Sequence, residues 1–528
     1  MDNESLSPSR RDLILMTGVA TAGAVAATRG SWRSESTPSA PSNILINVRD
    51  HGARGDGSAD DSSAVRDAMK VAQSKGQPAT IYFPRGTYRV KAGTLTVPAG
   101  HPMIIRGDGP RSSQISLSAS ETSTDALISL DATFAAVEDL QLDGGGSAAG
   151  NDLLVLNAGY NRVSNCNIDR APGAGLAIGK KGRSLAHMLE NLIIRDSVSY
   201  GIRVHGPAGK DETGSTDGLW SNVDVGRSGL SGVFLQSSSQ NMSNVHVWQS
   251  GTRAGDDGDQ HGFRVTSRTH IFSGCQAEKN LGDGFHFESG GGDGTVISGC
   301  RIWENGGAGL IGEGTRHLTV VGSTFTRNGR NNVGDAASDD AVSAAAIHND
   351  GGDAWTITGC SAWDDTNELS AVWVPENSTT PEIPRRGQTM SQTYAYVETG
   401  SRGRSSITGA MFRAEEHLSG SSIKTESALL RVSNSDLGDD DVPVVPAAAT
   451  ITLPPWGDVI RVSGQVKVTK ISDSRPGRSV TLMFDSDSAG GISDGADMQI
   501  RGAFLPNAGG SISLIFLGEK WREQARSA

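Results

Sequence analysis

Apolar residues recur in a repeated pattern from about residue 134 to residue 423. Each repeat reads apolar-x-(Asn or Gly)-x-x-apolar, then a polar loop, then Gly-apolar-x-apolar. Asn and Gly enter the left-handed backbone region at low cost, so each marker predicts a sharp bend between two short strands. Successive markers stand 22 to 37 residues apart, which fits one three-strand coil of a β-helix with variable loops. The markers are Asn165, Asn191, Asn222, Asn244, Gly274, Gly299, Gly322 and Gly359.

The Gly-apolar-x-apolar segments predict strands with one face in a core. They begin at Gly201, Gly232, Gly262, Gly284 and Gly309, with Ala346 as a sixth equivalent. Because side chains alternate across a strand, the first and third residues after each start should point inward. These are nearly all apolar: Ile202, Val233, Phe263, Phe285, Leu310 and Ile347, then Val204, Leu235, Val265, Phe287, Gly312 and Asn349.

The outward residues of the same strands form two predicted columns rich in ionisable groups. One column is Arg203, Phe234, Arg264, His286, Ile311 and His348; the next is His205, Gln236, Thr266, Glu288, Glu313 and Asp350. Neighbouring coils lie about 4.8 Å apart, so the three acids are expected to form a row of carboxylates that raise each other's proton affinity. Neighbours in the row fit the roughly 5 Å separation of retaining glycosidases, and acids two coils apart approach the inverting separation. The sequence leaves that choice open.

These columns supply the candidate site. Glu288, Glu313 and Asp350 are the candidate catalytic residues. His261, like Asp283, comes just before its strand and is expected to project from the rim. The alternative interpretation is a solvated β-helix face, which is polar in any case. The candidate substrate-binding residues, for sugar hydroxyls or uronate carboxylates, are Arg203, His205, Arg264, His261, His286 and His348.

The segment from residue 44 to residue 90 predicts a strand, a Gly-Asp-Gly turn, a helix over 61–74, and a second strand. Asp60 and Asp61 are expected to cap the helix. Its apolar face is Ala64, Val65, Ala68, Met69 and Ala72.

That segment, NVRDHGARGDG with a following helix and ATIYFPRGTYRV, resembles the entry module of the pectate-lyase-like right-handed parallel β-helix superfamily. The superfamily includes proteins related to glycoside hydrolase family 28 and tailspike-like proteins. The resemblance implies an all-β fold, with a single right-handed parallel β-helix over 44–425 and the helix capping its first coil. It also implies an extracellular protein that binds and cleaves a polysaccharide on the outward face of the Gly-started strands.

The resemblance does not fix the reaction. Of the polygalacturonase-like motifs, the chain has only His261-Gly262 and scattered Asp pairs. Arg264 beside the three acids resembles the proton abstractor of calcium-dependent lyases, and Ca²⁺ is implied only in that case. Hydrolysis is the leading hypothesis; the alternatives are a polysaccharide lyase acting on a uronate polymer and a non-catalytic glycan-binding or surface-structural β-helix. No cofactor or metal site is predicted otherwise.

Composition and charge limit the partners. The 528-residue chain has 68 Gly, a net charge of -12 and a pI near 5.4, which argues against a nucleic-acid partner. It has no run of the roughly 20 apolar residues that a membrane helix needs. The four cysteines each follow a bend marker by one residue, which predicts a buried row of free thiols, with a Cys275–Cys300 disulfide as the alternative.

The two ends of the chain differ from its middle. Residues 1–43 contain Arg10-Arg11, an apolar run over 13–27 and small residues around Ala26 and Ala27, which resembles a twin-arginine export signal with cleavage near these alanines, followed by a linker. The protein is therefore expected to be secreted. Residues 426–528 carry alternating runs that predict a small antiparallel β-domain. Its last residues loosely resemble β-modules of tailspike-like proteins, which leaves monomer and homotrimer open.

Overall fold

The computed structural model describes residues 44–527, except 208–213, 254–258, 289, 330–344, 364–393, 401–403, 413–422, 426–429, 434, 436–441, 455–456, 473–475, 486–489 and 496. The predicted export signal and its linker lie outside the described residues. In the part of the chain that is described, no helix is long and apolar enough to cross a membrane.

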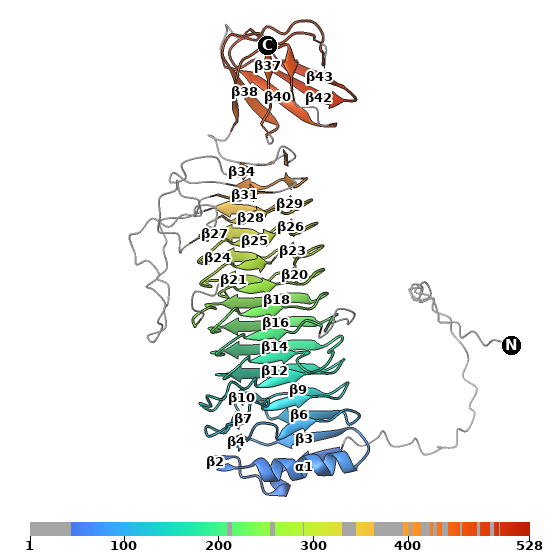
Figure 1. Ribbon diagram of the computed structural model, residues 1–528, viewed down its shortest axis with the longest axis vertical. Helices are drawn as coiled ribbons and strands as arrows, with labels where there is room; N and C mark the ends of the chain where they lie inside the picture. The colour runs from blue at the N-terminus through green and yellow to red at the C-terminus, as the bar shows by residue number, and fades with distance from the viewer. Residues whose placement is uncertain are drawn as a thin grey trace, which may run out of the picture. The chain divides into compact units, whose positions relative to one another are not determined.

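Residues 44–433 form a right-handed parallel β-helix, as predicted (Figure 1). One of its two long parallel sheets has 12 strands among the described residues, and successive strands come from successive coils. We call its solvent side the outer face. Its strands are β5 (Leu95–Val97), β8 (Ile128–Leu130), β11 (Leu154–Leu156), β13 (Leu176–Ile178), β15 (Ile202–Val204), β17 (Val233–Leu235), β19 (Phe263–Val265), β22 (Phe285–Phe287), β25 (Leu310–Glu313), β28 (Ile347–Asp350), β31 (Tyr396–Thr399) and β34 (Ile423–Thr425).

The other long sheet has 23 parallel strands and closes the remaining sides of each coil. Its last described strand extends the β-helix past the predicted boundary at residue 425. The strands are β1 (Ile44–Asn47), β2 (Asp56–Asp60), β3 (Ala79–Phe83), β4 (Gly86–Val90), β6 (Met103–Gly107), β7 (Ser113–Leu117), β9 (Ala136–Glu138), β10 (Gln141–Asp143), β12 (Arg162–Asp169), β14 (Met188–Arg195), β16 (Leu219–Gly226), β18 (Asn241–Trp248), β20 (Ile271–Ser273), β21 (Gln276–Glu278), β23 (Val296–Ser298), β24 (Arg301–Trp303), β26 (Thr319–Val321), β27 (Thr324–Thr326), β29 (Thr356–Thr358), β30 (Ser361–Trp363), β32 (Ser406–Thr408), β33 (Met411–Phe412) and β35 (Arg431–Ser433).

The bend markers adopt the predicted left-handed conformation. All eight have φ between 53° and 61°. The four asparagines also form a ladder along the helix axis: Asn191 Nδ2 donates to Asn165 Oδ1 at 3.1 Å, Asn222 to Asn191 at 3.1 Å, and Asn244 to Asn222 at 2.8 Å. The marker residues therefore set the bend and also bond neighbouring coils together.

Substitution of Asn191 tests this double role. Asn191→Ala places a residue without a local polar partner in the left-handed region and removes both ladder bonds, at an expected cost of about 2 kcal/mol. Asn191→Gly loses the bonds but accepts the backbone, so it should cost about half as much. Urea denaturation of both variants measures the difference. Equal costs for the two variants would contradict the backbone part of the explanation.

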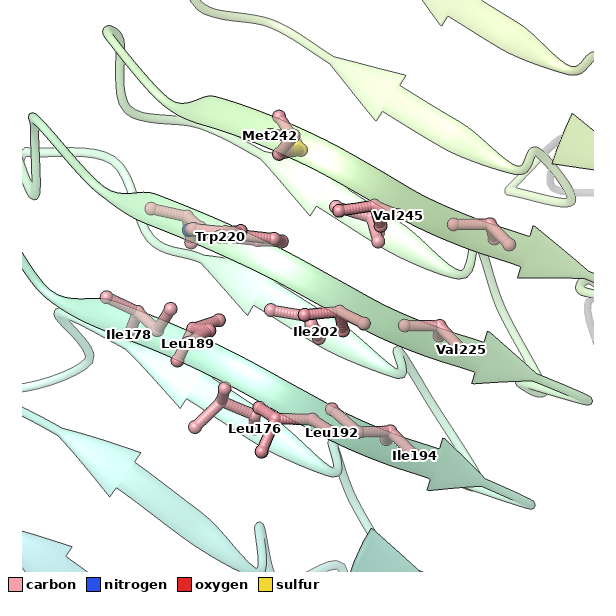
Figure 2. Packing of buried hydrophobic residues seen from close by; sticks show 14 of the residues in the cluster. Leu176, Ile178, Leu189, Leu192, Ile194, Ile202, Trp220, Val225, Met242 and Val245 are labelled. Carbon is pink, nitrogen blue, oxygen red and sulfur yellow. The ribbon is translucent and has the colours of Figure 1, made fainter. Parts of the chain in front are cut away.

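The interior of the β-helix is one continuous apolar core. The inward residues of both predicted columns belong to it, except for the polar Asn349 and the glycine Gly312. Phe263 and Phe285 stack at 4.5 Å between ring centroids. Figure 2 shows Leu176, Leu192 and Ile202 in this interior. The four cysteines are free and buried, as predicted, but they do not form a continuous row, because Cys166 is stacked on Leu192.

Helix α1 (Ser62–Ser74) packs its predicted apolar face on β1, β3 and β5, and that face is part of the same core. A short 3₁₀ helix, η1 (Val48–His51), contacts it. The prediction that the Asp61 side chain caps the helix is wrong. Its carboxylate accepts instead from the backbone N–H groups of Arg54 at 2.7 Å and Gly55 at 3.1 Å, which fixes the preceding turn. Asp60 accepts from Ser62 N at 3.0 Å.

The C-terminal strands form a six-stranded sheet with a core of its own. Its strands are β36 (Val444–Pro446), β38 (Val459–Ser463), β40 (Ser479–Phe484), β42 (Ser511–Leu517), β43 (Lys520–Ser527) and β41 (Met498–Gln499), accompanied by the pair β37 (Thr450–Ile451) and β39 (Lys470–Ile471). The predicted all-antiparallel arrangement is wrong, because β36, β38 and β40 pair in parallel. The strand pairs β40–β42 and β42–β43 are antiparallel, and a tight turn at Gly518 joins the second pair. Alternation of apolar residues indicates strands but not their direction.

Candidate functional site on the outer face

The predicted outward columns are in register on the outer face. Arg264 pairs with His286, His286 with Ile311, and Ile311 with His348. Glu313 pairs with Asp350 on the next coil. Close packing of the coils requires glycine where these strands start: a Cβ on Gly284 would lie 2.6 Å from the carbonyl oxygen of Gly309. The glycines at the strand starts therefore let neighbouring coils pack closely, with the outward residues of each column aligned.

The three acids do not form a row of free carboxylates. Glu288 binds the guanidinium of Arg264, whose Nη1 also lies 2.6 Å from Asp259 Oδ2. The positive charge of Arg264 balances Glu288, which removes the repulsion expected from three equal neighbours. Glu313 and Asp350 are the two acids of the row that stand on adjacent strands beyond this ion pair.

Asp283 is the centre of a second cluster. Its Oδ2 accepts a hydrogen bond from His286 Nδ1 at 2.7 Å and lies 3.0 Å from His261 Nδ1. Its Oδ1 accepts from the backbone N–H of Ala308 at 2.7 Å. The two imidazole rings stack with centroids 4.1 Å apart. The expectation that His261 and Asp283 project from the rim is wrong: their side chains are only 10% and 14% exposed, because both carboxylate oxygens are bonded within the face.

The electrostatics of this cluster favour a charged pair. Burial raises the pKa of Asp283, but hydrogen bonds from His261 and His286 outweigh it and hold the pKa well below its usual range. Burial lowers the pKa of His286, but the bond to Asp283 and the charges of Glu313 and Glu288 outweigh it, so the pKa is raised. His286 Nε2 lies 3.5 Å from Glu313 Oε1. The imidazole of His286 thus lies between a buried carboxylate and an exposed one.

The stability of this pair should depend on pH. The pKa of His286 is raised above its usual value of 6.5, so its contribution to stability is complete below that pH and is lost as the pH rises through the folded-state pKa. His286→Gln should therefore lower the melting temperature most at about pH 6 and progressively less toward about pH 9. Thermal denaturation of both proteins across this range measures the effect. A pH-independent difference would contradict the charged pair.

The sequence pattern did not connect Arg264 with Asp259, nor Asp259 with Tyr200 and Ser231. Asp259 Oδ2 accepts from Tyr200 Oη at 2.5 Å, and Oδ1 accepts from Ser231 Oγ at 2.5 Å. Burial and this bond to Asp259 raise the pKa of Tyr200 to about 12. Tyr200 and Ser231 stand two residues before the first inward residue of their strands, as do His261 and Asp283. Alternation would place this position on the inward side, so the periodic pattern would not have found them.

The remaining predicted residues lie on the same face but make separate contacts. Arg203 donates to Gln236 Oε1 at 3.0 Å, and its guanidinium lies over the rings of Tyr200 and Phe234. Burial and the charge of Arg203 lower the pKa of His205 to about 4.

At the other end, His348 Nε2 lies 3.0 Å from Thr399 Oγ1, which donates to Asp350 Oδ1 at 3.1 Å. Burial lowers the pKa of His348. The pKa of His348 near Asp350 is thus shifted in the opposite direction from that of His286 beside Glu313.

One group of potential metal ligands is present among the described residues. The ligand atoms of His261, Asp283 and His286 lie within 4.8 Å of one another. Two nitrogens and one carboxylate oxygen suit a transition metal better than Ca²⁺, which takes oxygen ligands. Hydrogen bonds within the cluster already account for the positions of these atoms.

Comparison with known proteins agrees with this geometry. The fold and the outer-face site define a pectate-lyase-like β-helix protein. Residues 45–311 match the family described as rhamnogalacturonase A/epimerase, pectate lyase-like, and the chain belongs to this carbohydrate-active family. The match includes Asp283 and His286 and ends two residues before Glu313.

Solved structures share the fold. The A-module of mannuronan C-5 epimerase AlgE4 of Azotobacter vinelandii is similar with a TM-score of 0.52 and 15% identity, covering 74% of this chain and 97% of that one. The AlgE6 A-module from the same organism gives 0.50 and 15%, covering 74% and 98%. The Dettilon tailspike protein gives 0.49 and 11%, covering 73% and 69%. No curated protein matches the chain.

Proposed function

We propose that this protein binds a polysaccharide along the outer face and hydrolyses a glycosidic bond there. The observation that carries the proposal is the chain of acid–base groups from Asp283 through His286 to Glu313. It runs from a buried carboxylate to one that is 40% exposed and can reach a substrate. Asp350 pairs with Glu313 on the next coil, so the two carboxylates come from equivalent positions of adjacent strands.

In the proposed reaction, Glu313 is the acid and Asp350 the nucleophile. Asp350 attacks the anomeric carbon, the glycosidic C–O bond breaks, and the leaving oxygen takes a proton from Glu313. Water then attacks the glycosyl ester, gives a proton to Glu313 and releases Asp350. The strand separation of about 4.8 Å is close to the roughly 5 Å of retaining enzymes. His286 holds Glu313 in place and keeps a proton within its reach.

The other candidate residues are assigned to binding. Arg264, held by Glu288 and Asp259, presents a fixed cation over the ring of Phe234. His261 positions Asp283. Arg203 and His205 on one side and His348 on the other extend the same face beyond the reacting groups.

A polysaccharide lyase is the second candidate. It is favoured by Arg203 and Arg264, whose guanidinium groups both lie over Phe234 and suit a uronate carboxylate. A lyase removes the proton at C5 and leaves an unsaturated uronate. C5 epimerisation begins with removal of the same proton but leaves the polymer intact.

A substrate panel separates these reactions. The mature protein is incubated with rhamnogalacturonan, mannuronan and a neutral dextran, and reducing ends and unsaturated-uronate absorbance are both followed. Reducing ends without absorbance, with retained anomeric configuration by NMR, are expected. Absorbance would indicate the lyase, and a changed uronate composition without new ends an epimerase. Binding without any of these changes would reject catalysis.

We also propose export through the twin-arginine route. Arg10 and Arg11 precede the apolar run of the first 43 residues. The double variant Arg10→Lys, Arg11→Lys should keep the precursor in the cytoplasm. Fractionation with immunoblotting measures this, and unchanged secretion of the double variant would reject the route.

A further inference from the structure

A second polar cavity lies on the outer face at the first coils. It has a volume of about 290 Å³ and is lined by side chains of β5, β8 and β11 and by Lys180 and Lys181 after β13. Its polar wall is fixed by hydrogen bonds: Asp131 Oδ1 accepts from Asn157 Nδ2 at 2.7 Å, and Asn157 Oδ1 accepts from the backbone N–H of Lys181 at 2.8 Å. The cavity is therefore organised before any ligand arrives.

Two exposed aromatic residues closely follow two residues of the polar wall in the chain. Phe134 follows Asp131 by three residues and Tyr160 follows Asn157 by three, so each is at most about 10 Å along the chain from the polar wall. The rings are stacked, with centroids 4.9 Å apart and planes inclined by 11°. Phe134 is 66% exposed and Tyr160 43%. They form an open apolar platform on the turns that follow the polar wall.

The backbone at both rings is in an unfavourable conformation. Phe134 has φ 60° and Tyr160 φ 61°, values at which bulky side chains are rare. The next coil has Ala186 at the equivalent position, with φ 49°. The same left-handed turn recurs in later coils at Asp217, with φ 62°, and Ser239, with φ 60°, so this conformation belongs to the fold. Phe134 and Tyr160 differ from these residues in carrying large aromatic side chains that stay exposed.

We propose that Phe134, Tyr160 and the cavity form a second glycan-binding site, separate from the Asp283 cluster. The C–H face of a pyranose ring packs on the aromatic platform while its hydroxyls bond Asp131 and Asn157. Lys181 is 70% exposed, with Nζ 3.9 Å from Asp125, and can reach a hydroxyl or carboxylate of the same sugar. The ligand class, a polysaccharide segment, rests on the proposed function.

The distance between the two sites would let the second glycan-binding site hold the polysaccharide during the reaction. Five strand steps separate β11 from β22, so the cavity and His286 are about 24 Å apart on the same face. A long polymer can occupy both sites at once, whereas a short oligosaccharide cannot. Occupancy of the first coils raises the effective concentration of the polymer at the second site.

Affinity electrophoresis tests the proposal without relying on turnover. All proteins carry Glu313→Gln, so that the polymer stays intact, and are run through gels containing rhamnogalacturonan, mannuronan or dextran. Adding Phe134→Ala and Tyr160→Ala should weaken polymer binding about tenfold, because two stacking contacts are lost. Ala186 at the equivalent turn indicates that the backbone accepts alanine, and circular dichroism checks the fold. Leu45→Ala, at a residue 62% exposed elsewhere, is the matched control and should leave retardation unchanged.

Lys181→Ala supplies an independent variant on the opposite wall, with an expected loss of about threefold. The proposal is overturned if the aromatic double variant is retarded as strongly as its parent, or if the parent is retarded by none of the polymers. Retardation that depends on the rings, in a protein whose wild type cleaves nothing, would reject the proposed hydrolysis and keep the second site.

Discussion

Phe285→Asp is expected to prevent the β-helix from folding. Phe285 is fully buried and stacks on Phe263 at 4.5 Å, with Phe272 edge-on at 5.1 Å. Replacement removes these contacts and leaves an unpaired carboxylate in an apolar stack, at a combined cost of about 5 kcal/mol or more. That cost is comparable to the whole stability of a typical domain. Circular dichroism and limited proteolysis should show loss of the cooperative thermal transition.

Two variants control for position and chemistry. Ile311→Asp introduces the same charge on the adjacent strand, at a position that points outward from the core. This variant should keep the cooperative thermal transition. Phe285→Leu keeps an apolar side chain and should lower stability by only a few kcal/mol. A folded Phe285→Asp protein would mean that the interior of these coils is not the continuous core described above.

Glu313→Gln is expected to reduce catalysis by at least about a hundredfold while leaving the fold intact. The substitution keeps the shape of the side chain and removes the only group that the proposed reaction uses as proton donor. Glu313 is 40% exposed, so the loss of its charge should change stability little. Initial rates of reducing-end release, together with a melting curve, measure both effects.

Glu190→Gln is the matched control, because Glu190 is an exposed glutamate on β14 of the other sheet. It should retain full activity. Glu288→Gln should chiefly weaken substrate binding, since it frees Arg264 from one of its two acids. Full activity of both Glu313→Gln and Asp350→Asn would show that this pair of residues does not catalyse the reaction.

The stacking of the outward columns could be predicted from sequence because it follows from periodicity alone. Gly201, Gly232 and Gly262 mark equivalent positions, and alternation then assigns every following residue to a side. The bend at each Asn or Gly marker has the same basis, since few residues enter the left-handed region. These features need no knowledge of side-chain conformation.

The bonding within the face could not be predicted in this way. Asp259 lies outside the strands, and its approach to Arg264 depends on the path of a loop and on rotamers. Without that ion pair, Glu288 is indistinguishable from Glu313 in the column. The burial of Asp283 likewise depends on the backbone N–H of Ala308 in the following coil, which periodicity does not describe.

The most direct test of the central claim is a crystal structure of the Glu313→Gln protein with an oligosaccharide of its confirmed substrate. The account predicts that the sugar crosses the outer face, with a glycosidic oxygen within hydrogen-bond distance of residue 313 and the adjoining anomeric carbon facing Asp350. An oligosaccharide bound instead against the other sheet, for example in the groove lined by Met188, Leu219 and Ile271, would contradict it.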